Sequence, residues 1–225
     1  MGDGSARVHS EGSCRISIPL PCCGLQGRAA CEIRSGDELL ATEMIFSGLL
    51  GELSHEEALA IMVALIFQAR TAEARRAPPG RALQPSSDRC ILVKSQEKSD
   101  NSPRLTDRVR QAKAKVLAIA KTAGAVQQQC GLQVSPDELC ETALNWGLSE
   151  VVYEWARGTS FHEICSLTDV MEGSIVRTIV RLEELCRQFT DVARVMGNPQ
   201  LYQLMERARE AIKRDVIFAA SLYLS

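Results

Sequence analysis

Four polar residues, Arg177, Arg181, Glu184 and Gln188, lie on one side of a helix that the sequence predicts over 172–196. At about 100° per residue they share one face of that helix, roughly opposite its apolar side. Two guanidinium groups, a carboxylate and an amide in a row can contact the phosphates and base edges of a nucleic-acid strand. The same row can also simply face water, so the pattern leaves both interpretations open.

The opposite side of this helix is apolar. Its residues recur with alternating spacings of four and three, which forms one continuous stripe along a helix. The members of the stripe are Ile175, Ile179, Leu182, Cys186, Phe189, Ala193 and Met196. We therefore predict that this side is buried against the rest of the domain.

The spacing of charged residues on this helix supports the interpretation that its polar face lies in water and binds no ligand. Arg181 and Glu184 are separated by three positions, and Glu183 and Arg187 by four. Opposite charges at these spacings stabilise an exposed helix by roughly 0.2–0.5 kcal/mol per pair without any ligand. Periodicity alone thus favours a helix face in water.

A helix-turn-helix is a further alternative, with a short helix at 161–168 followed by the long one. A DNA reader of this kind needs basic residues where its second helix begins. The sequence there is Met171-Glu172-Gly173, which does not favour DNA binding.

The chain shows no signature of a nucleotide-hydrolysing or triad-type enzyme. It has no glycine-rich phosphate loop, and the nearest text, at 120–122, lacks the glycines. Asp137-Glu138 belongs to a predicted helix cap and not to the strand context of a DExH carboxylate box. The three histidines, at 9, 55 and 162, suggest no Ser/His/Asp arrangement. We expect no ATP hydrolysis by this chain alone.

Composition is that of an ordinary globular protein. The 225 residues can form one sizeable domain, with 45% hydrophobic and 24% charged residues and a net charge of −2. Aromatic residues are only 4%, which argues against a base-stacking platform. The balanced charge gives no broad basic surface, so any nucleic-acid contact must be local.

Cysteine usage and hydropathy indicate a reducing compartment and no membrane span. No apolar run reaches the roughly 18 residues that a spanning helix needs. Nine cysteines lie mostly at apolar helical positions, as expected for buried thiols in the cytosol or nucleus. Cysteines 14, 22, 23 and 31 with His9 lack a C-x-x-C pair, so we expect no metal site.

The remaining patterns predict an all-α, multi-helix bundle of about seven or eight helices. Residues 1–24 have no helical period and read as an irregular leader, and 70–103 is a Pro- and Ser-rich flexible linker or insertion. Capping signals lie at 35–37, 54–57, 135–138 and 160–163, and Gly197-Asn198-Pro199 ends the long helix. A last helix over about 200–223 is predicted to pair antiparallel with the long helix.

Three blocks of the sequence, in order, resemble a known family. They are GRAACEIRSGDELLATEMIF (27–46), GLSEVVYEWARGTSFHEICSLTDVMEGSIVRTIVRLEELCRQ (147–188) and KRDVIFAASLYL (213–224). They are similar to the C-terminal helical domain of superkiller-type, exosome-associated DExH-box RNA helicases. The resemblance covers 25–225 apart from the linker, and it implies that the long helix is the family's ratchet helix along the RNA channel.

The resemblance also implies a set of functional expectations. The family's strand-contacting Arg and Glu fall on Arg181 and Glu184, with Arg177 one turn earlier and Gln188 continuing the row. The expected partners are single-stranded RNA, the helicase motor domains, the exosome and superkiller-type adaptor subunits. ATP and Mg²⁺ would bind the motor domains of a 3′–5′ helicase, so this chain itself is expected to hold no cofactor.

Two alternatives remain within this interpretation. The text EGSIVRTIVRLEE, with Thr178 and Val180, is closer to the cytoplasmic superkiller branch than to the nuclear branch. The rival function is a non-enzymatic helical module that docks on a protein and never meets RNA. A docking face should carry exposed apolar anchors, whereas the face with Arg177 and Arg181 is polar.

Overall fold

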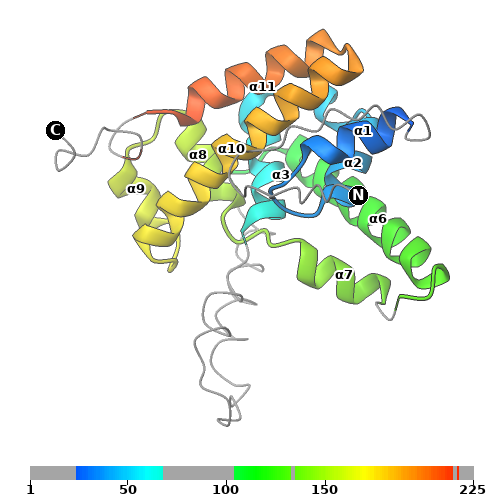
Figure 1. Cartoon of the computed structure of the whole chain (residues 1–225). Coiled ribbons are helices and arrows are strands. Elements are labelled where there is room, and N and C mark those ends of the chain that lie inside the picture. The colour runs from blue at the N-terminus through cyan, green and yellow to red at the C-terminus, as the bar shows by residue number, and fades with distance from the viewer. Residues whose placement is uncertain (1–23, 68–103, 133–134, 215–216, 218–225) are drawn as a thin grey trace, which may run out of the picture.

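The computed structural model describes residues 24–67, 104–132, 135–214 and 217. These residues form nine α-helices and one 3₁₀ helix, and none of them is in a strand (Figure 1). The all-α prediction is confirmed. The structure also contains one short α-helix, α1, that the sequence analysis did not predict. The leader up to residue 23 and the linker at 70–103 lie outside the described residues.

The helices follow one another in this order: α1 (Leu25–Glu32), α2 (Glu38–Phe46), the 3₁₀ helix η1 (Leu49–Glu52), α3 (His55–Ile66), α6 (Asp107–Gln129), α7 (Pro136–Ala143), α8 (Ser149–Ala156), α9 (Phe161–Ser166), α10 (Glu172–Met196) and α11 (Pro199–Ile212). Helix α10 is the longest, with 25 residues.

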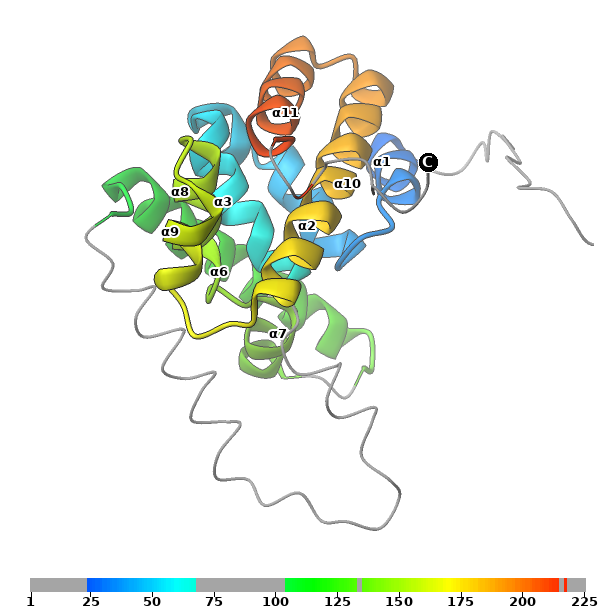
Figure 2. The ribbon, with the colours of Figure 1, turned by 90° about the vertical axis from the view of Figure 1, so that its left-hand side faces the viewer.

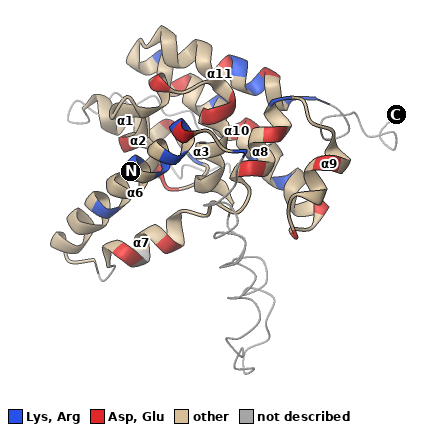
Figure 3. Cartoon of the chain, turned by 180° about the vertical axis from the view of Figure 1, so that it is seen from behind, with Lys and Arg blue, Asp and Glu red and all other residues tan. Residues whose placement is uncertain are grey.

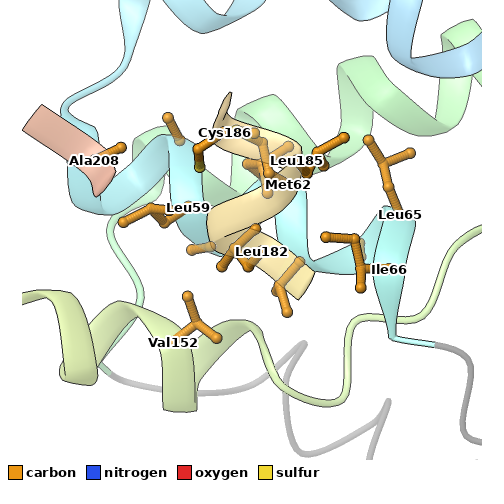
Figure 4. Packing of buried hydrophobic residues seen from close by; sticks show 14 of the residues in the cluster. Leu59, Met62, Leu65, Ile66, Val152, Leu182, Leu185, Cys186 and Ala208 are labelled. Atoms are coloured by element: carbon orange, nitrogen blue, oxygen red, sulfur yellow. The ribbon is translucent and has the colours of Figure 1, made fainter. Parts of the chain in front are cut away.

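Helix α3 lies at the centre of the bundle. From Glu57 to Ile66 every residue is buried, as expected for a helix that is apolar on all sides and has neighbours on all sides. Helices α8, α10, α11 and α6 all pack against it. Figure 4 shows side chains of α3 meeting Val152 of α8, Leu182 and Cys186 of α10 and Ala208 of α11.

Local capping fixes where the helices begin. Ser54 and Glu57 form a capping box at α3, and Ser160 and Glu163 form another at α9, as the sequence predicts. The Glu57 carboxylate also accepts a hydrogen bond from the Thr106 hydroxyl at 2.7 Å. Since Thr106 is itself the N-cap of α6, this contact joins the starts of α3 and α6.

Helices α10 and α11 form an antiparallel hairpin (Figures 1 and 2). Gly197 ends α10 in the left-handed conformation with φ of 67°, which glycine adopts without steric cost. The Asn198 side chain then caps α11 by accepting from two backbone N–H groups, and Pro199 occupies its first position. Arg209 of α11 donates two hydrogen bonds to Glu183 of α10, at 2.9 and 3.1 Å.

Helix α11 is shorter than predicted, because it ends at Ile212 and not near 223. The indole Nε1 of Trp155 donates to the Ile212 carbonyl at 3.0 Å, which occupies an acceptor that a continuing helix would use. The Arg214 guanidinium lies 3.8 Å from the centre of the Trp155 ring and donates to the carbonyl of Thr159. These contacts direct the chain toward α8 and α9.

Charged residues are interspersed over the helices, with basic positions on α6 and acidic ones on α7 (Figure 3). This agrees with the net charge of −2. None of the described helices is both long enough and apolar enough to cross a membrane.

Candidate nucleic-acid interface

The predicted apolar stripe of α10 is buried. Ile175, Ile179, Leu182, Cys186 and Phe189 are completely inaccessible to solvent, and Ala193 is nearly so. Only Met196, in the last turn, is half-buried. The stripe therefore orients α10, so that its opposite face is the part available to a ligand.

Arg177 lies exposed in the first half of α10. Its Nε donates to the backbone carbonyl of Gly173 at 3.0 Å, and its Nη2 lies 3.4 Å from the hydroxyl of Ser174. Both partners belong to the preceding turn of the same helix. The guanidinium thus lies along the surface, held by contacts that water or a phosphate can replace at little cost.

Arg181 is also exposed, one turn further along the same face. Within the described part of the chain it makes no hydrogen bond and no ion pair. Its spacing suggested a pair with Glu184, but the structure does not form that pair. Arg181 therefore presents its guanidinium fork without a competing protein partner among the described residues.

Glu184 pairs with Arg187 instead. The guanidinium donates Nε to Oε2 at 3.0 Å and Nη2 to Oε1 at 2.5 Å, a bidentate arrangement between partly exposed side chains. These bonds from Arg187 hold the pKa of the Glu184 carboxyl below its usual value, with a smaller contribution from Gln188. Glu184 is thus an ionised acceptor that Arg187, not Arg181, orients.

Gln188 does not lie on the open face, where the sequence placed it. It is buried, with 6% of its surface exposed, because the connection between α1 and α2 covers this side of α10. Its amide oxygen accepts from the backbone N–H groups of Arg34 and Ser35 at 2.9 and 3.1 Å. Its amide nitrogen donates to the Ser35 hydroxyl at 3.0 Å and to Glu184 Oε1 at 3.2 Å.

These four bonds use the full hydrogen-bonding capacity of the Gln188 amide, two accepted and two donated. The expectation of an exposed amide is therefore wrong, and a direct RNA contact would require breaking bonds that hold the fold. Helical angle alone could not reveal this. The covering segment lies more than 150 residues away in sequence.

Sequence reasoning missed Arg187 as a member of this surface. Its spacing of three from Glu184 was a usable signal, but the pair expected for Arg187 was Glu183. The structure uses Glu183 to bind Arg209 of α11, so that carboxylate belongs to the hairpin and not to the open face. The described surface thus consists of Arg177, Arg181, Glu184 and Arg187.

The described residues offer no metal site, since they contain no group of three His, Cys, Asp or Glu side chains close enough to hold an ion. Of the cysteines weighed for zinc, only Cys31 is described, and it is exposed as a free thiol. His9 and the others lie outside the described residues.

The comparisons with known proteins bear on the whole bundle. Residues 23–219 match the family model described as DSHCT (NUC185) domain. This chain belongs to the DSHCT domain family. The resemblance to the C-terminal domain of superkiller- and MTR4-type DExH-box RNA helicases is thereby confirmed.

The proteins that this chain resembles include one from Arabidopsis thaliana and two from Homo sapiens. The DSHCT chain is 44% identical over 201 residues to the DExH-box ATP-dependent RNA helicase DExH11 of Arabidopsis thaliana. It is 39% identical over 199 residues to the human Superkiller complex protein 2, and 37% identical over 200 residues to the human Exosome RNA helicase MTR4. These alignments cover 88–89% of this chain but only 13–16% of the relatives, so the chain spans a small part of their length.

Proposed function

We propose that this DSHCT domain is the C-terminal helical domain of an ATP-dependent 3′–5′ RNA helicase that acts with the exosome in RNA decay. Its role is positional: the first half of α10 guides the single RNA strand. The observation that carries this proposal is the exposed Arg181, which has no partner among the described residues and lies one turn from Arg177. The relatives named RNA helicase and exosome RNA helicase support the class of ligand.

The chemistry of the face suits a strand that moves. Two arginines on successive turns can each form charge-assisted hydrogen bonds with a phosphate, and either guanidinium can stack on a base. Among the described residues no carboxylate pairs with either arginine, so binding RNA requires no such ion pair to break. Such contacts, strong individually but few in number, allow the strand to be held and released.

The remaining steps of the reaction are assigned to other domains. ATP and Mg²⁺ bind the motor domains, whose closure moves the strand past α10, and this domain supplies no hydrolytic residue. We propose the exosome and superkiller-type adaptor subunits as partners, in keeping with the names of the relatives. The text around Thr178 and Val180 favours the cytoplasmic branch, with the nuclear branch as the alternative.

A binding experiment tests the strand contact directly. Fluorescence anisotropy of a labelled single-stranded RNA is measured with wild type and with Arg177→Ala/Arg181→Ala, over a series of salt concentrations. If the two contacts together contribute about 2 kcal/mol, the double variant binds about 30-fold more weakly. The slope of log K against log salt is negative, and loss of two phosphate contacts should make it shallower by about 1.4.

The matched control is Arg108→Ala/Arg207→Ala, which removes two exposed arginines on α6 and α11. Net charge falls equally in both double variants, so only a local contact separates them. Equal losses in the two variants, or no RNA binding by folded wild type, would contradict the proposal.

A protein-docking role has one observation in its favour. Leu39 at the start of α2 and Val126 near the end of α6 are each 52% exposed, on helices that pack together. Exposed apolar residues of this kind suit a protein contact, such as one with the motor domains. They lie on helices other than α10, so this role complements strand guidance and does not replace it.

A further inference from the structure

Gln188 connects two distant parts of the chain through a single amide. On one side it is fixed by the backbone N–H groups of Arg34 and Ser35 and by the Ser35 hydroxyl. On the other side its remaining donor reaches Glu184 at 3.2 Å. Because every position of the amide is used, the side chain has a single orientation, and its second N–H points at the Glu184 carboxylate.

The Glu184 carboxylate is held from both ends as a result. Within the described ranges, Oε1 accepts from Arg187 and from Gln188, while Oε2 accepts from Arg187 alone. A carboxylate oxygen has two lone pairs, so Oε2 retains one free acceptor position. The Glu184 side chain is 40% exposed, so a ligand can approach its carboxylate from solvent.

We propose that Gln188 is a positioning residue that acts on RNA through Glu184, fixing Oε2 to accept a hydrogen bond from the amino group of a base. This inference rests on the proposed function, because it concerns the same face of α10. It adds that this face of α10 distinguishes between the bases of the RNA. Cytosine should be preferred to uracil where the strand passes Glu184.

The preference follows from the edges of the two pyrimidines. Cytosine presents its N4 amino group, a donor that carboxylates accept. Uracil has a carbonyl oxygen at the same place, which repels an ionised carboxylate. The two bases have the same size, so phosphate contacts and stacking largely cancel when the affinities are compared.

The experiment compares the affinities of oligocytidylate and oligouridylate of equal length for wild type and variants. Wild type should prefer oligocytidylate by about tenfold, the ratio expected of one good base contact. Glu184→Ala should bring the ratio close to one. It also releases Arg187, but that change strengthens the binding of both RNAs alike and leaves the ratio unaffected.

Gln188→Glu is the decisive variant. It keeps an acceptor for the N–H groups of Arg34 and Ser35 but places a second carboxylate oxygen against Glu184 Oε1. Repulsion then displaces Glu184, and the ratio should fall as far as in Glu184→Ala. In the background of Glu184→Ala the same change should have no further effect, since the two residues act as one unit.

A swap variant separates positioning from a purely structural role. Glu184→Gln/Gln188→Glu restores a donor between the two side chains, so its melting temperature should recover toward that of wild type. The ionised carboxylate is then at the buried position, and the preference for oligocytidylate should stay lost. Recovery of the preference together with the melting temperature would overturn the inference, as would an undiminished preference in Gln188→Glu.

The controls distinguish this failure from failure of the proposed function. If Arg177→Ala/Arg181→Ala binds both oligonucleotides as tightly as wild type, strand guidance by α10 is wrong. If that variant binds weakly but Gln188→Glu keeps the wild-type ratio, only the role of Gln188 is wrong.

Discussion

The two halves of α10 have the same amphipathic pattern but very different surroundings. In the second half, Leu185–Met196, seven of twelve residues are buried, whereas in the first half, Glu172–Glu184, only four of thirteen are. Helix α11 runs back along the second half, and the connection between α1 and α2 covers the side that contains Gln188. The first half extends past this enclosure with its polar face open.

The difference shows how one helix can serve both the fold and a ligand. In the second half, polar groups contact other parts of the domain: Gln188 holds the connection between α1 and α2, and Arg194 lies 3.5 Å from the Tyr202 hydroxyl of α11. In the first half, Arg177 and Arg181 make no contact that the fold requires. These two guanidinium groups can therefore bind a moving strand without loss of a contact that the fold needs.

The largest expected effect is on the enclosed half. Phe189→Ala removes a completely buried ring and should lower the free energy of unfolding by about 3–5 kcal/mol. Equilibrium urea denaturation measures this loss. Val195→Ala, at a 37% exposed site on the same half, should change it by less than about 0.5 kcal/mol. A small effect at Phe189 would show that α11 does not enclose α10 as described.

Gln188→Leu should give the next largest effect. It leaves the N–H groups of Arg34 and Ser35 without this acceptor, and because both hydrogen bonds are only partly buried, the expected total cost is about 1–3 kcal/mol, the cost of one fully buried unpaired group. The same denaturation experiment applies, with Arg181→Ala as the control at an exposed site. A cost below about 1 kcal/mol would mean that water reaches this side of α10, and the two halves would then be alike.

The smallest expected effect belongs to the Glu184–Arg187 pair, where the open half of α10 meets the enclosed half. The Arg187 bond lowers the pKa of Glu184 in the folded protein, so the pair adds stability above the ordinary carboxyl pKa and loses it as pH falls through the lowered value. Because the side chains are partly exposed, Glu184→Gln should cost less than about 1 kcal/mol at pH 7. This difference from wild type should shrink in denaturation curves recorded as the pH falls through the lowered pKa of Glu184, and disappear below it. A difference that persists there would mean that the carboxylate charge is not its source.

The sequence predicts most of the helices and the buried stripe of α10, because apolar periodicity and capping residues are local signals. Ser54 with Glu57, and Ser160 with Glu163, were identifiable as capping boxes and are present. The end of α11 could not be predicted, since it depends on Trp155 taking the Ile212 carbonyl from another helix.

In the candidate site, too, the features set by local sequence could be predicted and those set by distant segments could not. The spacing of Arg177 and Arg181 places both on one face, and the structure leaves both exposed. The burial of Gln188 depends on a segment more than 150 residues away, and no helical projection contains that information. Which of two similarly spaced carboxylates pairs with Arg187 likewise depends on α11, because Arg209 binds Glu183.

The most direct test of strand guidance is a crosslinking measurement that compares two exposed valines of α10. A photoreactive amino acid replaces Val180 in the first half or Val195 in the second, at 43% and 37% exposure respectively. Each variant is irradiated with labelled single-stranded RNA, and the RNA attached to protein is quantified. We expect attachment from position 180 and little from position 195. Equal attachment from both, or more from 195, would contradict the assignment of RNA to the first half of α10.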